Sequence, residues 1–265
     1  MNSYLSGTPL LENCVVLVSG GTQGVGAGVV RAAVREGAVV AFTGRRVGVG
    51  SALQDELNAA GHTAHFIEAD VSDPDSARRS VERTVDKFGR IDALCNAAGL
   101  TTRGTLVDTT PELFDQHIGV NLRGPFFTMQ AAVQNMLSRS AAGTIVNIIS
   151  IAEHGGQSFL APYVAAKAGL AGLTKNAAYA HRWDRIRING LNIGWTETEG
   201  ETEIQKRFHG GDDDWAATAN NSVPMGTLGQ VDEIADFVVL LLSSRSGVVT
   251  GSVIDWDQTV IGGQD

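Results

Sequence analysis

The sequence has few cysteines, few prolines and no long hydrophobic run. Its two cysteines, Cys14 and Cys95, lie in apolar stretches, so we expect small buried side chains in a reducing compartment rather than a disulfide framework. The six histidines lack the spacing of a metal site, and no metal is expected. No apolar stretch approaches the length of a membrane span, and the first residues do not resemble a signal peptide, which predicts a cytoplasmic protein without a membrane partner.

Basic charge is also scarce in this chain. Twenty lysines and arginines stand against 29 aspartates and glutamates, which gives a net charge of −9. Such a surface repels phosphate backbones, so no nucleic-acid partner is expected. Hydrophobic residues make up 43% of the chain, as is typical of soluble globular proteins. The length fits a single domain over residues 1–265 with a substantial core.

Short apolar segments alternate with longer helical patterns along the chain. The segments predict strands at 14–18, 39–43, 64–68, 91–95, 144–149, 186–193 and 252–254. Helices are predicted at 24–36, 51–60, 74–88, 110–138, with a kink at Gly124-Pro125, and at 161–180 and 231–242. Strands that are apolar throughout favour a parallel sheet, and the alternation predicts an α/β, doubly wound Rossmann fold with a seven-stranded parallel sheet flanked by helices. A (β/α)₈ barrel, the competing architecture, would need an eighth unit. Residues 196–224 lack a strand pattern and are expected to form a substrate lid.

A glycine-rich loop joins the first predicted strand to the first predicted helix. Its glycines follow a G-x-x-x-G-x-G spacing. Such glycines allow the turn, the approach of a pyrophosphate and the packing of helix on strand, while the helix N-terminus offers free N–H groups. The loop therefore predicts a dinucleotide site, with a tight turn without ligand as the alternative. The predicted contacts are Gly20, Thr22, Gln23, Gly24, Val25 and Gly26.

The end of the second predicted strand indicates which dinucleotide binds. A carboxylate there would bind the ribose hydroxyls and repel a 2′-phosphate, but the sequence has Arg45 and Arg46. Two arginines suit a bidentate phosphate contact, so NADP(H) is favoured, with NAD(H) as the alternative cofactor and a solvated turn as the alternative role of the arginines. Asp70 ends the third predicted strand, where its carboxylate could accept from an adenine amino group or serve the turn.

Four side chains indicate the chemistry. Tyr163 and Lys167 are four residues apart on a predicted helix and so share a face. A neighbouring ammonium favours the phenolate, and the pair can then exchange a proton with an alcohol or carbonyl oxygen while hydride moves to or from nicotinamide. Ser150 ends the preceding strand, where it can stabilise charge on the reacting oxygen. Asn121 is unfavourable within a helix, which suggests a task such as holding a proton-relaying water.

In this order, from Ser19 to about Asp257, these residues resemble the short-chain dehydrogenase/reductase family. The resemblance implies a homotetramer or homodimer and a catalytic tetrad of Asn121, Ser150, Tyr163 and Lys167. Tyr163 would be the acid and base, Lys167 would lower its pKa and bind the nicotinamide ribose, Ser150 would orient the substrate, and Asn121 would support the proton relay. Further cofactor contacts implied by the resemblance are Val71, Asn96, Ala97, Ala98, Gly99, Ile193, Gly194 and Thr196.

The chain departs from the family pattern outside the tetrad. The departures are Asn96-Ala97-Ala98-Gly99 for Asn-Asn-Ala-Gly, Ile193-Gly194 for Pro-Gly, Trp256-Asp257 for a glycine pair, and Gln23 where NADP-selective relatives often carry a basic residue. The first change is expected to be tolerated, because that segment mainly shapes the floor of the cofactor site. The last weakens the preference for NADP(H).

Polar and aromatic side chains in two segments are expected to border the substrate. They are Glu153, His154, Gln157 and Phe159 before Tyr163, and Trp195, Phe208, His209 and Trp215 near the lid. They favour a small-molecule alcohol or ketone such as a sugar, polyol or cyclic ketone, with solvated or packing roles as the alternative. The chain is thus expected to be an NAD(P)(H)-dependent oxidoreductase that interconverts a secondary alcohol and a ketone. The alternative is a non-catalytic dinucleotide-binding sensor or scaffold, which would not need all four tetrad side chains.

Overall fold

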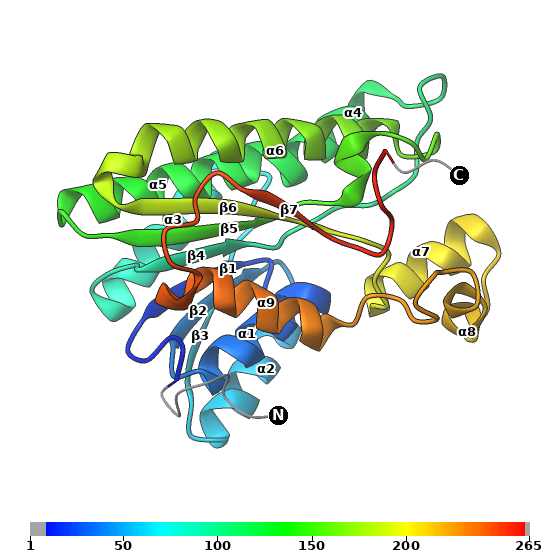
Figure 1. Ribbon diagram of the computed structural model, residues 1–265. Helices are drawn as coiled ribbons and strands as arrows, with labels where there is room; N and C mark the ends of the chain where they lie inside the picture. Colours follow the sequence, from blue (N-terminus) through cyan, green and yellow to red (C-terminus); the bar gives the residue numbers. More distant parts are fainter. Residues whose placement is uncertain (1–8, 263–265) are drawn as a thin grey trace.

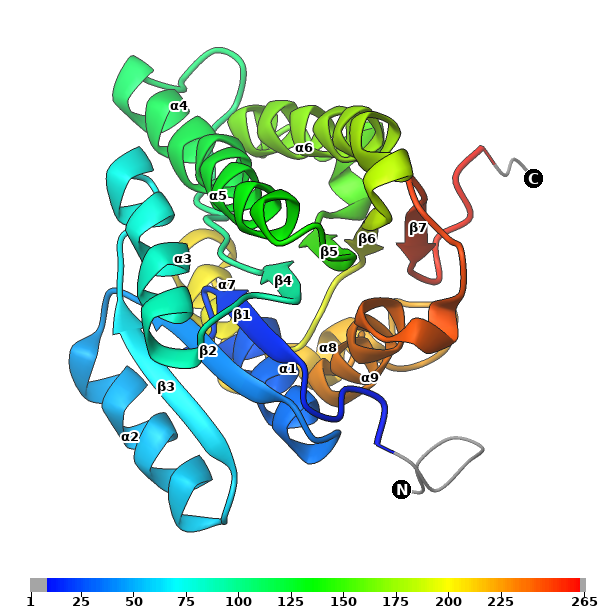
Figure 2. The same cartoon turned by 90° about the vertical axis from the view of Figure 1, so that its left-hand side faces the viewer.

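The structure, a computed structural model, describes residues 9–262, which build one parallel sheet with helices on both faces (Figures 1 and 2). The strands are β1 Val15–Ser19, β2 Val39–Gly44, β3 Thr63–Glu68, β4 Ala93–Asn96, β5 Gly143–Ile148, β6 Ile186–Ile193 and β7 Val253–Trp256. Their order in the sheet is β3-β2-β1-β4-β5-β6-β7, and every neighbouring pair is parallel. The predicted doubly wound fold is confirmed, and the open sheet with β3 and β7 at its edges excludes the barrel.

Two helical layers enclose this sheet (Figure 2). One face is covered by α1 Gly24–Arg35, α2 Val47–Ala59 and α9 Val231–Leu242, and the other by α3 Pro74–Phe88, α5 Gly124–Ser138 and α6 Ala161–His181, with α4 Pro111–Ile118 preceding α5. Successive strand residues point to opposite faces, so Val16 and Val18 join the core under α1 and α9, whereas Leu17 joins the core under α3 and α5. Burial on both faces explains why these strands are apolar throughout.

Two helices differ from the sequence prediction. The helix expected from residue 51 begins at Val47, since the glycines in its first turn allow close packing: a side chain on Gly50 would collide with the Phe66 ring. The helix expected over 110–138 is interrupted by a π-helical turn, Gly119–Arg123. This turn ends directly before Gly124-Pro125, where the kink is expected, and Pro125 lies in the first turn of α5, where its missing N–H leaves no helical bond unmade.

Two short helices, α7 Glu199–His209 and α8 Trp215–Asn220, follow β6 and project beyond the carboxyl ends of the strands (Figure 1). The sequence pattern does not predict these two helices. The Thr198 hydroxyl accepts from the Glu201 N–H at the start of α7, and Gly210 ends the helix at a φ of +66°. The Thr-x-x-Glu spacing before this helix is a capping signal that could have revealed it.

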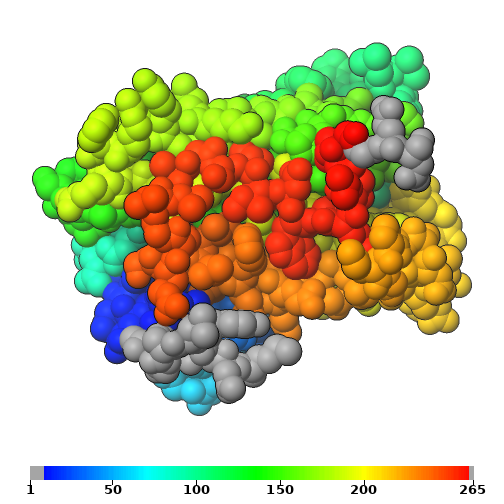
Figure 3. Space-filling model, viewed as in Figure 1, coloured from blue at the N-terminus to red at the C-terminus, as the bar shows by residue number. Residues whose placement is uncertain are grey.

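One edge of the sheet is formed by β7, which lies with the segment after it at the surface beside α6 and α9 (Figure 3). Val248 and Val260, on either side of β7, are largely exposed. Within residues 9–262, no helix combines the length and the apolar character that a membrane crossing requires.

Candidate active site

A cleft of about 1320 Å³ opens at the carboxyl ends of the strands, between the sheet and α7. Pockets for drug-sized ligands measure roughly 300–1,000 Å³, so this cleft has room for a dinucleotide and a second small molecule. Every predicted catalytic and cofactor-binding residue lines the cleft except Asn96 and Asn121. The side chains of Asn96 and Asn121 lie behind the wall of the cleft, and the roles expected for them stay predictions.

The glycine loop forms the part of the cleft next to α1. Gly20 has a φ of +81°, and a Cβ there would lie 2.5 Å from the Ala98 backbone. A Cβ on Gly26 would overlap the carbonyl oxygen of Gly20. Gln23, the N-cap of α1, makes no side-chain cap, so the first N–H groups of the helix remain available to an anion. This cradle, which a single added methyl group would fill, fits the pyrophosphate of a dinucleotide.

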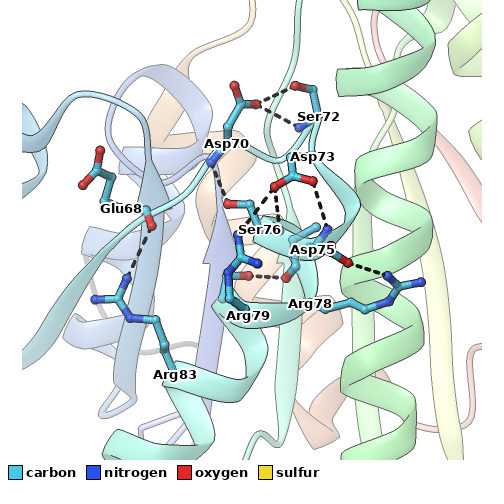
Figure 4. Close-up of polar contacts among 11 residues, drawn as sticks. Glu68, Asp70, Ser72, Asp73, Asp75, Ser76, Arg78, Arg79 and Arg83 are labelled. Carbon is cyan, nitrogen blue, oxygen red and sulfur yellow. Dashed lines mark hydrogen bonds and ion pairs between the residues drawn. The ribbon is translucent and has the colours of Figure 1, made fainter.

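Exposed arginines and a fixed carboxylate border the cleft beside the glycine loop. Arg46 donates to the Gln23 side chain across the loop. Asp70 accepts from the N–H and the hydroxyl of Ser72 at 2.9 and 2.7 Å, both at Oδ1 (Figure 4). Burial opposes the charged form of Asp70, but the Ser72 bonds and the charge of Arg45 outweigh burial and lower its pKa. The turn role is therefore present, and no donor within residues 9–262 reaches Oδ2, which a ligand in the cleft could bind.

Tyr163 and Lys167 lie one turn apart on α6, and both are buried. The Lys167 ammonium donates to the carbonyl oxygen of Ile148 at 2.8 Å, and Nζ lies 5.6 Å from the centre of the Tyr163 ring. Ser150 follows β5, accepts from the Ala152 N–H at 3.2 Å, and lies close enough to the Tyr163 phenol to lower its pKa. Serine, tyrosine and lysine thus meet at one point of the cleft, as the sequence predicts.

Burial sets the proton affinities of this group. It raises the pKa of Tyr163 to about 12, although the Ser150 side chain has the opposite effect, and it lowers the pKa of Lys167 to about 8. Burial outweighs the groups that lower the pKa of Tyr163, so the expected lowering of this pKa is not found in the protein alone. At neutral pH the phenol keeps its proton and the amine is mostly charged, an arrangement that is ready to donate a proton.

Asn121 lies in the π-helical turn and faces the loop after β4. Its Nδ2 donates to the Leu100 carbonyl oxygen at 3.0 Å, and its Oδ1 accepts from the Leu100 N–H at 2.9 Å. These bonds account for a buried asparagine within a helical region, because they fix the loop that borders the cleft. The water relay stays a prediction, and it would have to share an amide that Leu100 already occupies.

His117 was missed by the sequence analysis. It is buried one turn before Asn121, contacts the side chain and carbonyl of Thr102 at 3.1 and 3.0 Å, and packs edge-on against the Tyr163 ring. Burial lowers its pKa, so the ring is neutral at neutral pH. The spacing of four residues from Asn121 could have indicated that the two side chains share a face.

Asn96 lies beneath the cleft instead of lining it. Thr128 donates to Asn96 Oδ1 at 2.6 Å, Asn96 Nδ2 donates to Asn147 at 2.8 Å, and Asn147 donates to Thr174 at 2.9 Å. All four residues are buried. This chain of hydrogen bonds joins α5, β4, β5 and α6, so Asn96 supports the floor of the site, and its contact with the cofactor stays a prediction.

The departures from the family pattern pack against one another. A Cβ on Gly194 would overlap the Asp257 carboxylate, and a Cβ on Gly229 would lie 3.2 Å from the Trp256 ring. The residues that replace the C-terminal glycine pair therefore fill space that two other glycines leave open. Gly194 keeps its place in the cleft wall.

Only some of the expected substrate residues reach the cleft. Those that line it are Gln157, Phe159, Trp195 and His209. Glu153 and His154 instead contact a buried asparagine and an aspartate behind the cleft, Asn192 and Asp255. Trp215 is buried with its ring 5.7 Å from that of Trp195, and Phe208 lies outside the lining. Across the described part of the chain, no group of three or more histidines, cysteines and carboxylates could hold a metal ion.

Comparisons with known proteins give one family. Residues 20–259 match the family described as enoyl-(acyl carrier protein) reductase. The chain is 33% identical over 251 residues to an L-rhamnose 1-dehydrogenase (NAD(P)(+)) from Azotobacter vinelandii, covering 92% of this chain and 94% of the relative. It is 33% identical over 253 residues to a trans-4-hydroxycyclohexanecarboxylate dehydrogenase from Sinomonas cyclohexanicum, with 92% of each covered. A crystal structure of a variant actinorhodin polyketide ketoreductase with NADPH superposes with a TM-score of 0.88 at 27% identity, covering 93% of this chain and 96% of the other.

Proposed function

The chain belongs to the short-chain dehydrogenase/reductase family, and from this premise we propose that Tyr163, Ser150 and Lys167 interconvert a secondary alcohol and a ketone. The protein is an NAD(P)-dependent oxidoreductase. One observation carries the assignment of residues: a buried phenol, a serine hydroxyl and a buried lysine line the same cleft, whose other end is a glycine cradle.

Tyr163, Ser150 and Lys167 would each have a different role in the reaction. The bound nicotinamide would supply the hydride in reduction and accept it in oxidation. In reduction, the Tyr163 phenol donates its proton to the carbonyl oxygen, and the Ser150 hydroxyl stabilises the charge that develops there. In oxidation, the phenolate accepts the hydroxyl proton. Lys167 gives one of its three N–H groups to Ile148, which leaves two for the nicotinamide ribose and a proton relay.

Replacing Tyr163 tests this proposal. Tyr163→Phe removes the proton donor and keeps the ring, so we expect turnover to fall by roughly 10²–10⁴-fold, with cofactor binding nearly unchanged in a fluorescence titration. Undiminished turnover would contradict the mechanism. The same variant addresses the alternative of a non-catalytic sensor or scaffold, because a binding protein would show no dependence of turnover on Tyr163.

We further propose that NADP(H) is preferred to NAD(H). Exposed Arg45 and Arg46 at the end of β2, with no carboxylate beside them on the strand, support a contact with a 2′-phosphate. Titration of the wild type should give tighter binding of NADPH than of NADH, and Arg45→Ala should weaken NADPH binding alone. Tighter binding of NADH together with no loss in the variant would overturn the preference.

The substrate class, the lid and the assembly are also proposals. A sugar, polyol or cyclic ketone is supported by the aromatic and polar lining of the cleft and by the names of the relatives, and a screen of such compounds with both cofactors tests it.

Residues 196–224 would act as the substrate lid. A homotetramer or homodimer, measurable by light scattering, would cover exposed apolar side chains such as Val248 and Val260. A cytoplasmic location agrees with the free thiols of Cys14 and Cys95.

A further inference from the structure

An ion pair crosses the substrate end of the cleft. Arg103, in the loop after β4, approaches Glu201 on α7 with 3.5 Å between Nη2 and Oε1. The two side chains are only 12% and 15% exposed, and both line the same cleft as Tyr163. Taking two charges out of water is costly unless further polar partners satisfy them, so the partners of this pair indicate what it is for.

Neither Arg103 nor Glu201 uses all of its hydrogen-bonding atoms within the described residues. Arg103 donates from Nε to His209 at 3.0 Å and from Nη1 to the Thr101 carbonyl at 2.8 Å. A guanidinium has five N–H donors, so among residues 9–262 two of them, one on each terminal nitrogen, are left without an acceptor once Glu201 is counted. These donors lie in the wall of the cleft, where a bound molecule could accept from them.

The carboxylate of Glu201 is used unevenly. The Trp195 indole at 3.1 Å, the Gln205 amide at 2.7 Å and Arg103 all reach Oε1. Within the described residues, no donor reaches Oε2. The capping pattern at the start of α7 would ordinarily turn such a glutamate back toward the backbone, but here the carboxylate is directed to the cleft. The pair thus offers two donors and one acceptor side by side.

We propose that Arg103 and Glu201 recognise two neighbouring hydroxyl groups of the substrate, which makes a neutral cyclic polyol or sugar the substrate class. One hydroxyl donates to Glu201 Oε2, and the other accepts from a free N–H of Arg103. Trp195 and Phe159 line the same cleft and offer apolar ring faces. This assignment rests on the oxidoreductase function proposed for Tyr163.

Charge balance favours a neutral substrate over an anionic one. The paired side chains carry no net charge, and hydroxyl groups leave that balance unchanged. A substrate carboxylate would add an uncompensated negative charge next to Glu201 in a nearly buried site. Beyond the effect of burial, the charge of Glu201 raises the pKa of Tyr163 and that of Arg103 lowers it, so both groups lie within electrostatic reach of the reacting phenol.

Selectivity between matched alcohols tests the proposal. The oxidation of cyclohexane-1,2,3-triol, cyclohexanol and trans-4-hydroxycyclohexanecarboxylate is followed by absorbance of the reduced cofactor in the wild type, Arg103→Met, Glu201→Gln and Glu201→Leu. Glu203→Gln, an exposed change on the same helix, is the control. We expect the wild type to prefer the triol, and the ratio of kcat/KM for triol over cyclohexanol to fall roughly tenfold or more in Arg103→Met and Glu201→Leu, with no change in Glu203→Gln.

A gain of activity completes the test. Removing the charge in Glu201→Gln should raise the kcat/KM for the carboxylate relative to the triol, an effect that loosened packing would not produce. If the variants lose activity on all three alcohols in equal proportion, or if the wild type does not prefer the triol, the pair only fastens α7 and the inference fails while the oxidoreductase stands. If the wild type oxidises none of the alcohols and reduces none of the matching ketones with either cofactor, the proposed function itself fails.

Discussion

Replacing Lys167 by methionine separates the charge of this side chain from its length. Methionine keeps an unbranched chain of similar reach but cannot carry a charge or donate a hydrogen bond. Below a pH of about 8, the pKa to which burial lowers Lys167, the wild type carries an ammonium 5.6 Å from the centre of the Tyr163 ring. That charge favours the phenolate, which is the base in alcohol oxidation.

The size of the effect follows from this distance. Two unit charges at this separation interact by about 3 kcal/mol at an effective dielectric constant of roughly 20. Since about 1.4 kcal/mol is a factor of ten, Lys167→Met should lower the phenolate population, and with it the rate of oxidation at neutral pH, by on the order of 100-fold. Reduction should lose less through this route, because Tyr163, with a pKa of about 12, holds its proton in both proteins.

The oxidation deficit of Lys167→Met should vary with pH in a definite direction. The lysine loses its charge as the pH rises through about 8, so the deficit of Lys167→Met in oxidation should be largest below that pH and should shrink above it. Lys167→Arg is the matched control, because a guanidinium keeps its charge throughout, and its advantage over the methionine variant should persist at high pH.

The assay is steady-state oxidation and reduction at saturating cofactor, with cofactor binding measured separately, since Lys167 also faces the proposed ribose site. If the ratio of wild-type to Lys167→Met oxidation stays constant across this pH range, the lysine acts by position alone. The electrostatic account of the pair would then be refuted.

Three further predictions concern the scaffold. Gly26→Ala should abolish dinucleotide binding in a fluorescence titration, because its Cβ would overlap the Gly20 carbonyl oxygen; retained binding would contradict the cradle. Thr128→Val should lower the free energy of unfolding in urea by about 1–3 kcal/mol, since it leaves Asn96 Oδ1 buried without its donor. The pKa of His117 is lowered by burial, so the unfolded chain binds the proton more readily and stability should fall as the pH drops through the ordinary histidine value of about 6.5. His117→Gln should flatten this fall, and an unchanged slope would show that the ring is not buried in its neutral form.

The fold could be predicted because its signals are local. Apolar strands, helix periodicity, and the Pro74 and Pro111 helix starts each depend on neighbouring residues. The errors arose where distant contacts decide the local structure. The start of α2 depends on Phe66 lying against Gly50, and the π-helical turn places Asn121 against Leu100, a residue on another segment.

The contrast between local signals and distant contacts also explains which parts of the site could be predicted and which could not. Tyr163 and Lys167 are four residues apart, so helix geometry alone brings them together. Arg103 and Glu201 are 98 residues apart, and no periodicity indicates that they meet. Their pairing depends on how the loop after β4 and α7 close over the sheet, which only the folded chain decides.

Arg103 and Glu201 lie near Tyr163, so the recognition of the substrate is linked to the proton transfer by the phenol. Burial dominates the proton affinity of the phenol, and the contributions of Glu201 and Arg103 have opposite signs. A substrate that engages both partners leaves both contributions in place, and the phenol keeps the proton that reduction requires. A ligand that displaced Glu201 from Arg103 would disturb that balance and alter the acidity of Tyr163. Selectivity for neutral hydroxylated rings would then follow from the needs of the proton donor as well as from the fit of the substrate.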